Sequence, residues 1–399
     1  MSRNEPDPTP TPTTHASDPS PRESSGVFSP GVIEDIQIKA NLARYRIRGF
    51  GTLRPRTWAT FDDLTFVPGT LTRIPLEGYR EKCSTRTILG TRFAKRPLEL
   101  EIPLMVTGMS YGALSKNAKT ALARGASRAG TSTTTGDGGM LDVERAESRK
   151  LVVEVLPSRY GIDIRHLRQA DALELTIGQG AKPGTGGLLL GSKVSEEIAG
   201  IRDLPPGVDQ RSPCRHPDFL GPDDMVVKIE ELREATHWEI PIFVKMGASR
   251  VFDDVRLAAK AGADVVVVDG MEGGTGASPE LLQEHTGIPT LAAVCEARAA
   301  LEDVGLFGKV QLVLAGGLRN GADCAKALAL GADACYLGTA LLIALNCNRP
   351  IFVEDYAAIG AAPYSCHHCH TGRCPVGIAT QDPMLSARLE VEDAAERVS

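Results

Sequence analysis

The sequence predicts an α/β protein whose main domain is a (β/α)8 barrel. Between residues 104 and 340 eight short apolar runs recur, each ending in Gly or a small polar residue. Six of them lead into a stretch of helical period or a helical insertion. Nearly continuous Val and Leu is typical of parallel strands buried on both faces. Eight such units in ~240 residues favour a closed barrel over an open doubly wound sheet.

The eight expected strands are LMVTGMS from Leu104, TSTTTGD from Thr131, LVVEVL from Leu151, ALELTIG from Ala172, PIFVKMG from Pro241, DVVVVDG from Asp264, QLVLAGG from Gln311 and ACYLGTA from Ala334. Residues 178–240 interrupt the rhythm after the fourth strand, beginning with IGQGAKPGTGG and continuing through a Pro-rich stretch. Loops that long inside a compact domain are usually functional.

Four regions are expected along the chain. Residues 1–30, rich in Pro, Thr, Ser and charge, have almost nothing to bury and are predicted to be a disordered tail, since their acidic residues count against a transit peptide. Residues 31–100 form an N-terminal lead-in with a helix around Val32 to Arg46. The barrel occupies residues 101–350, and residues 351–399 carry a cysteine cluster and a C-terminal tail.

Composition excludes several classes of protein. A net charge of −6 and the absence of any Lys/Arg block argue against a nucleic-acid partner. No apolar run approaches the ~20 residues that span a bilayer, and the N-terminus lacks a signal-peptide pattern, so a soluble cytoplasmic protein without a membrane partner is expected. Nine cysteines, mostly scattered singly, argue against a disulfide framework.

The residues just after each strand are the candidates for chemistry, because barrel active sites lie at the carboxyl ends of the strands. These ends are rich in glycine, which costs stability inside regular structure, so a ligand lying against the main chain is expected. Gly316, Gly317, Gly338 and Thr339 follow the seventh and eighth strands, where barrels commonly bind a phosphate; tight turns are the alternative. No Rossmann fingerprint is present, so the phosphate is expected to belong to flavin mononucleotide (FMN).

Two lysines are candidate site residues. Lys245, within FVKMG, would bring its ammonium to the barrel mouth, and a reduced flavin, anionic around N1, is a natural partner for it. Pairing with a barrel Asp or Glu is the alternative. Lys182, in QGAKPGTGG, suits a point-charge contact to a substrate carboxylate, and an exposed surface lysine is its alternative.

Three cysteines crowd together in CHHCHTGRCP, with the spacing Cys366-x2-Cys369-x4-Cys374 and a proline after the last. This pattern suits an iron–sulfur cluster. Zinc is the rival, because three histidines lie among the cysteines, although no second ligand pair is present. Three clustered thiolates favour a three-iron (3Fe-4S) cluster over 4Fe-4S, and Cys347 is the nearest candidate for a fourth ligand.

From Leu104 to Asp382 the chain resembles the FMN-binding synthase domain of glutamate synthases, especially the short stand-alone forms of archaeal-type enzymes and of N-methylglutamate synthase. The shared pieces, in the family's order, are PLMVTGMSYGALS, TTTGDGGM, IGQGAKPGTGG, PIFVKMG, VVDGMEGGTGASP, LAGGLRNGAD, LGTA and CHTGRCPVGIATQDP. The resemblance implies a barrel carrying FMN and an iron–sulfur cluster. In this family ammonia adds to 2-oxoglutarate, and reduced flavin converts the resulting 2-iminoglutarate to L-glutamate.

The resemblance also implies roles for individual residues. Lys182 would bind a 2-oxoglutarate carboxylate, Arg202 would bind a carboxylate bidentately, and Asp137 would orient the imine or relay a proton. Lys245 would lie near the isoalloxazine. The residues expected to hold FMN or line the same mouth are Met109, Ser110, Gly273, Gly274, Thr275, Gly316, Gly317, Gly338 and Thr339.

Three departures from the family pattern bear on the substrate and the partners. Leu188 replaces a glutamine and Gly221 lies near a hydroxyl residue of the family, so polar contacts around 2-oxoglutarate are expected to be lost. The first cysteine ligand of the large enzymes lies where this chain has Pro363, and Cys366 would replace it. The chain begins MSRN and has no NAD(P)H module, so glutaminase-type and electron-donor subunits are expected to supply ammonia and electrons.

Three functions compete. The first is the synthase subunit of a glutamate synthase-like oxidoreductase that acts on CH–NH2 donors. The second is the matching subunit of N-methylglutamate synthase, in which methylamine exchanges with the amino group of glutamate. The third is a non-catalytic barrel subunit without flavin, against which the retained Lys182, Lys245, Arg202 and glycine runs all count.

Overall fold

The computed structural model describes residues 30–42, 45–52 and 58–399. The chain divides into two units, residues 1–46 and 47–399. The described part of the first unit is the helix α1 (Pro30–Leu42) and the residues after it. The helix expected around Val32 to Arg46 is therefore present, but it begins two residues earlier and ends at Leu42. The tail predicted for residues 1–30 lies outside the described residues, except for Pro30, which begins α1.

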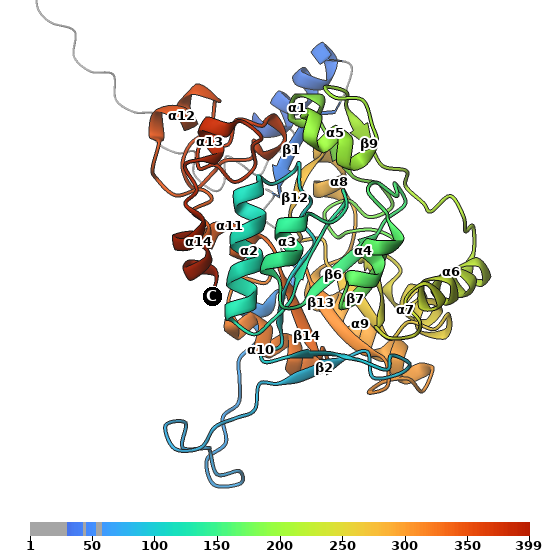
Figure 1. The fold of residues 1–399 in the computed structure, drawn as a ribbon. Coiled ribbons are helices and arrows are strands. Elements are labelled where there is room, and N and C mark those ends of the chain that lie inside the picture. Colours follow the sequence, from blue (N-terminus) through green and yellow to red (C-terminus); the bar gives the residue numbers. More distant parts are fainter. Residues whose placement is uncertain (1–29, 43–44, 53–57) are drawn as a thin grey trace, which may run out of the picture. The chain divides into compact units, whose positions relative to one another are not determined.

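Eight parallel strands of the second unit form the predicted barrel (Figure 1). Their order around the sheet is β4-β14-β13-β11-β10-β7-β6-β5, and the edge strands meet where the Val106 N–H donates to the Ser132 carbonyl at 2.9 Å. All eight correspond to the strands expected from the sequence: β4 (Leu104–Val106), β5 (Thr133–Thr134), β6 (Leu151–Val155), β7 (Ala172–Thr176), β10 (Ile242–Gly247), β11 (Val265–Asp269), β13 (Gln311–Ala315) and β14 (Ala334–Leu337).

Side chains along each strand alternate between the barrel interior and the layer of helices. On β11, Val265 and Val267 join the interior cluster, whereas Val266 and Val268 join the cluster beneath the helices. All four are fully buried. This explains the continuous apolar runs, since both faces of each strand are covered.

Helices follow all eight strands, where six were expected. Ser115 and Asn320 cap two of these helices by accepting hydrogen bonds from main-chain N–H groups in the first turn. The helices that follow strands directly are α2 (Lys116–Arg128), α3 (Asp142–Glu147), α4 (Ile164–Gln169), α7 (Val251–Lys260), α10 (Gly321–Leu330) and α11 (Thr339–Ala344).

Insertions follow β7 and β11. The first corresponds to the long segment noted in the sequence and contains β8 (Leu188–Leu189), η3 (Gly191–Lys193), α5 (Glu196–Arg202), β9 (Gln210–Arg211) and α6 (Pro222–Ala235). The second contains β12 (Thr275–Pro279), α8 (Glu280–His285) and α9 (Thr290–Asp303). Strands β8 and β9 pair with each other, so the first insertion is folded rather than an open loop.

The two ends of the barrel are closed differently. The hairpin of β2 (Thr87–Leu89) and β3 (Leu98–Leu100) buries three leucines in the interior cluster below the strands (Figure 1). At the carboxyl ends, β1 (Ile47–Phe50) pairs antiparallel with β12. The Gly49 N–H donates to the His367 carbonyl at 2.9 Å, which joins β1 to the cysteine segment.

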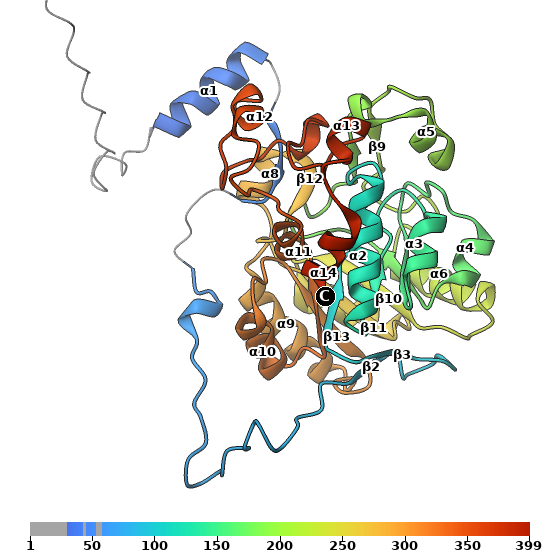
Figure 2. The ribbon, with the colours of Figure 1, turned by 60° about the vertical axis from the view of Figure 1, so that its left-hand side comes forward.

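The C-terminal segment contains α12 (Val353–Ala358), η4 (Cys369–Thr371), α13 (Pro383–Ser386) and α14 (Val391–Val398). Helix α14 packs along α2, where Arg124 and Arg128 pair with Glu392 (Figure 2). None of the helices among the described residues is long and apolar enough to cross a membrane.

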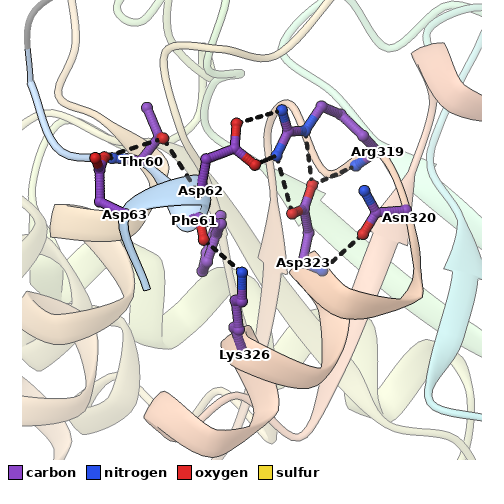
Figure 3. Close-up of polar contacts among 8 residues, drawn as sticks. All are labelled: Thr60, Phe61, Asp62, Asp63, Arg319, Asn320, Asp323 and Lys326. Atoms are coloured by element: carbon purple, nitrogen blue, oxygen red, sulfur yellow. Dashed lines mark hydrogen bonds and ion pairs between the residues drawn. The ribbon is translucent and has the colours of Figure 1, made fainter. Parts of the chain in front are cut away.

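A polar cluster fastens the 3-10 helix η2 (Phe61–Asp63) to the loop after β13 (Figure 3). Arg319 pairs with Asp62 at 2.6 Å and with Asp323 at 2.9 Å, and Lys326 donates to the Phe61 carbonyl at 2.6 Å. The loop that carries Gly316 and Gly317 is thereby held in place from the solvent side.

Candidate functional site

A cavity of about 430 Å³ lies at the carboxyl ends of the barrel strands. This volume is in the range of small-molecule and cofactor sites. Every site residue predicted from the sequence lines it: Met109, Ser110, Asp137, Lys182, Arg202, Lys245, Gly273, Gly274, Thr275, Gly316, Gly317, Gly338, Thr339, Cys366, Cys369 and Cys374. Leu188 and Cys347 line it too, so one cavity joins the glycine loops, the cations and the thiols.

The glycines of this cavity are required by the protein's own packing. Gly316 has a φ of +106°, and a Cβ there would lie 2.6 Å from the Gly270 nitrogen. At Gly317, with a φ of +69°, a Cβ would lie 2.5 Å from the Cβ of Glu272. Packing within the protein therefore accounts for glycine at both positions. Their conformation still brings bare main chain to the cavity wall, which suits a phosphate.

Lys245 lies in a charged layer at the cavity floor. Its Nζ is 3.5 Å from Glu174 Oε1 and 3.7 Å from Glu154 Oε1, and all three side chains are at most 5% exposed. Burial would lower the pKa of Lys245, but the two carboxyl groups outweigh burial and raise that pKa. Lys245 thus pairs with acidic residues of the barrel, which was the alternative prediction. It also lines the cavity.

Lys182 is buried, so the alternative prediction that it is an exposed surface lysine is wrong. Its Nζ donates to the Ala277 carbonyl at 2.7 Å on β12. Burial lowers the pKa of Lys182 to about 8, and the Asp137 carboxylate partly opposes this shift. Because only one of its three N–H donors has a partner among the hydrogen bonds of the described chain, Lys182 can take up an anionic group.

Asp137 and Arg202 lie on the same side of the cavity as Lys182. The Ser158 and Ser212 hydroxyls donate to the two Asp137 oxygens at 2.7 and 2.6 Å. Arg202 is buried at the end of α5 and donates to the Tyr111 and Asp137 carbonyls at 2.7 and 2.8 Å. Much of the Arg202 guanidinium is therefore engaged by the protein, which positions the Asp137 loop and leaves Nε for another acceptor.

A buried ion pair outside the cavity was not predicted. Lys119 on α2 lies 2.6 Å from Glu144 Oε1, and both side chains are at most 2% exposed. The Lys119 ammonium also donates to the carbonyls of Met109 and Thr135 at 2.7 and 2.8 Å. It thus ties the loop after β4 to the loop after β5, at two walls of the cavity.

The cysteines gather at one side of the cavity. All four of Cys347, Cys366, Cys369 and Cys374 line the cavity, and burial together with the three neighbouring thiols raises the pKa of Cys347. Asn348 links two of them, because its Oδ1 accepts from the Cys366 N–H at 2.8 Å and its Nδ2 lies 3.7 Å from the Cys347 sulfur.

Within residues 30–42, 45–52 and 58–399 no three His, Cys, Asp or Glu side chains are close enough to hold a single metal ion. The thiolates of an iron–sulfur cluster bind different iron atoms, so its cysteines lie farther apart than the ligands of a single metal ion. Lys193 supplies a cation here: its Nζ donates to the Cys369 and Ala113 carbonyls at 3.0 and 2.7 Å, and it is 1% exposed. Four thiols and a buried cation around one hollow fit such a cluster.

Glu154, Glu174 and Lys193 were missed by the sequence analysis. The signal for the two glutamates was present, because each interrupts an apolar strand (VVEV and LELT) at a position of the interior set. Lys193 carries no comparable signal, since its contacts join residues far apart in the chain.

Comparison with known proteins matches residues 74–399 to a family described as "Conserved region in glutamate synthase". The "Glutamate synthase large subunit-like protein" of Rhizobium meliloti (strain 1021) is 54% identical over 379 residues, 95% of this chain and 85% of that protein. An "Archaeal-type glutamate synthase (NADPH)" of Thermotoga neapolitana is 37% identical over 93% of this chain and 74% of its own. An "Archaeal glutamate synthase (NADPH)" of Methanocaldococcus jannaschii is 40% identical, over 78% and 58% of the two chains.

Proposed function

Because the chain belongs to the glutamate synthase family, we propose that it is the FMN- and iron–sulfur-containing subunit that reductively aminates 2-oxoglutarate to L-glutamate through 2-iminoglutarate. The family makes it an oxidoreductase that acts on CH–NH2 donors. The observation that carries the proposal is the single cavity in which glycine loops, buried cations and a thiol cluster meet.

The residues around the cavity fit FMN. Gly316, Gly317, Gly338 and Thr339 would hold the phosphate at the ends of β13 and β14. Met109, Ser110, Gly273, Gly274 and Thr275 would line the ring system. Lys245 would lie near the ring, and a cation there stabilises negative charge. The group supplies the electron pair for the reduction; the protein positions it and limits the entry of water.

The substrate would occupy the side of the cavity formed by the insertion after β7. Lys182 would bind one carboxylate as a point charge, and Arg202 would bind a carboxylate through its remaining donor while it holds the Asp137 loop. Asp137, fixed by two serine hydroxyls, would accept a hydrogen bond from the incoming amine or from the imine N–H.

The thiols of Cys366, Cys369 and Cys374 would bind a three-iron cluster next to the flavin, so that electrons can enter from a separate donor. Glutaminase-type and electron-donor subunits would supply ammonia and reducing equivalents in a larger complex. Cys347 is the candidate fourth ligand if the cluster has four irons.

N-methylglutamate synthesis is a second candidate, favoured by one observation. Leu188 lines the cavity where an apolar side chain can contact a methyl group. Gly221 gives no support, because it caps α6 and is not among the residues around the cavity. The chemistry would then use methylamine and glutamate in place of ammonia and 2-oxoglutarate.

The decisive experiment uses the purified protein loaded with FMN and iron, with dithionite as reductant. It is offered 2-oxoglutarate with ammonia or with methylamine, and glutamate with methylamine, and the amino acids formed are identified. Glutamate from ammonia supports the proposal, and N-methylglutamate supports the second candidate. A protein that takes up no FMN at micromolar concentration contradicts both.

Lys182→Ala is expected to weaken the binding of 2-oxoglutarate by about 10- to 100-fold, because a charge-assisted contact of about 1.5–3 kcal/mol is lost. FMN affinity should not change. The pKa of about 8 adds a pH dependence: the ammonium is charged below this value, so wild-type affinity should fall as the pH rises through it. Titration calorimetry between pH 6 and pH 10 measures both effects. Equal losses of affinity for FMN and for 2-oxoglutarate would contradict the assignment of Lys182 to the substrate.

A further inference from the structure

The interior layer contains a carboxyl group, Glu154, to which the proposed function assigns no role. Glu154 projects from β6 into the cavity, beside Gly108, where a Cβ would lie 1.8 Å from its Oε1. The absence of a side chain at position 108 therefore leaves room for this carboxyl group. Glu154 is 7% exposed and lines the same hollow as Lys245.

The charges around Glu154 do not balance if every group is ionised. It faces Glu174 on β7, Lys245 on β10 and Asp137 after β5. Asp269 on β11 also interacts with Lys245 and Glu174, so the nearest layer then holds three carboxylates against one ammonium. An uncompensated charge inside a protein costs several kcal/mol, so one of the two glutamates is expected to keep a proton.

The hydrogen bonds distinguish the two glutamates. The Tyr336 hydroxyl donates to Glu174 Oε2 at 2.8 Å, and the Lys245 ammonium is 3.5 Å from Glu174 Oε1. Glu174 is fully buried and does not line the cavity, so its contact with Lys245 is made within the protein interior. Two donors thus contact Glu174, whereas Glu154 has the more distant ammonium and a side-chain hydrogen bond with Glu174 that favours its neutral form.

We propose that Glu154 is a neutral carboxylic acid of the cavity floor and that it donates a proton to the substrate bound there. Burial raises the pKa of Glu154 to about 8; Lys245 partly opposes this, while Glu174 and Asp137 add to it. Asp137, held by two hydroxyls, provides an acceptor on the other side, so the two carboxyl groups have different environments and different tasks.

The inference rests on the proposed function, because it assigns a proton to that reaction. Converting a 2-oxo acid and ammonia to an amino acid and water consumes two electrons and two protons. The O–H bond of Glu154 breaks as an N–H bond forms at the imine nitrogen. The electrons come from the external reductant, and water that enters the cavity returns the proton to Glu154.

Infrared spectroscopy of the purified protein tests the protonation directly. The wild type should show a carboxylic acid C=O band at pH 7 that disappears as the pH rises through about 8. The isosteric Glu154→Gln variant should lack this band. In Glu174→Gln one raising influence is removed, so the band should disappear at a lower pH. Identical spectra for wild type and Glu154→Gln would overturn the proposal.

Kinetics of the loaded enzyme test the donation. Glu154→Gln should lower kcat by about 100-fold or more with little change in KM, and should abolish the decline of kcat above about pH 8. Lys182→Ala, in contrast, acts on KM. An unchanged kcat and pH profile in Glu154→Gln would contradict the role as donor. The infrared band needs no turnover, so a protein that shows it but forms no amino acid contradicts the proposed function and leaves the protonated carboxyl group established.

Discussion

Lys245→Met is expected to lower the free energy of unfolding by about 3–5 kcal/mol and to abolish tight binding of FMN. The reason is that Lys245 is the cation between Glu154 and Glu174, all at most 5% exposed. Removing one partner of a buried ion pair leaves an uncompensated charge in a medium that solvates it poorly. Urea denaturation measures the stability, and titration with FMN measures the binding.

A matched control is Lys95→Met, because Lys95 is 63% exposed and pairs with Glu239 at the surface. A surface pair contributes about 0–1 kcal/mol, so this variant should unfold like the wild type. The double variant Lys245→Met with Glu174→Gln removes one of the carboxyl groups that faced the lysine and should recover part of the lost stability. A Lys245→Met protein as stable as the control would show that the interior layer is not charged as described.

Cys374→Ser is expected to reduce bound iron to near zero and to stop electron transfer from the external donor to FMN, because the serine hydroxyl is a poor ligand for iron–sulfur clusters. Iron and acid-labile sulfide analysis, together with electron paramagnetic resonance, measures the loss. FMN should remain bound, since the glycine loops of β13 and β14 do not involve this residue.

Two further cysteine variants make the result specific. Cys295→Ser, exposed on α9, should keep its full iron content. Cys347→Ser separates the cluster types: a three-iron cluster should survive it, and a four-iron cluster should lose an iron. Iron at the wild-type level in Cys374→Ser, or zinc in its place, would contradict the assignment.

The barrel could be predicted because its pattern is local. Each strand is a run of residues buried on both faces, and β5, although it lacks apolar residues, lies within the run expected from Thr131. The site residues follow from the same rule, since the barrel brings all strand ends to one mouth.

The sequence marked the two glutamates below the mouth as interruptions of apolar strands, but it did not predict the layer of charges that they form with Lys245. Whether Glu154 and Glu174 face inward depends on the phase of each strand relative to its neighbours, which the register of β6 on β7 fixes and the sequence does not. Likewise, Lys119 and Lys193 contact main-chain carbonyls of distant loops. Because every residue has such a carbonyl, the sequence does not show which ones a lysine contacts.

Strand β1 and the residues just after it belong to the cavity, although they lie before the region that this chain shares with the family model. Phe50, Gly51 and Thr52 line the cavity, and Phe50 holds a φ of +81° at an irregularity of the β1–β12 pairing that turns its ring toward His367. These residues precede the conserved region that starts at residue 74. A fragment trimmed to that region would keep all eight barrel strands but would lack the part of the cavity wall that Phe50, Gly51 and Thr52 form. Recombinant fragments should therefore start upstream of Ile47.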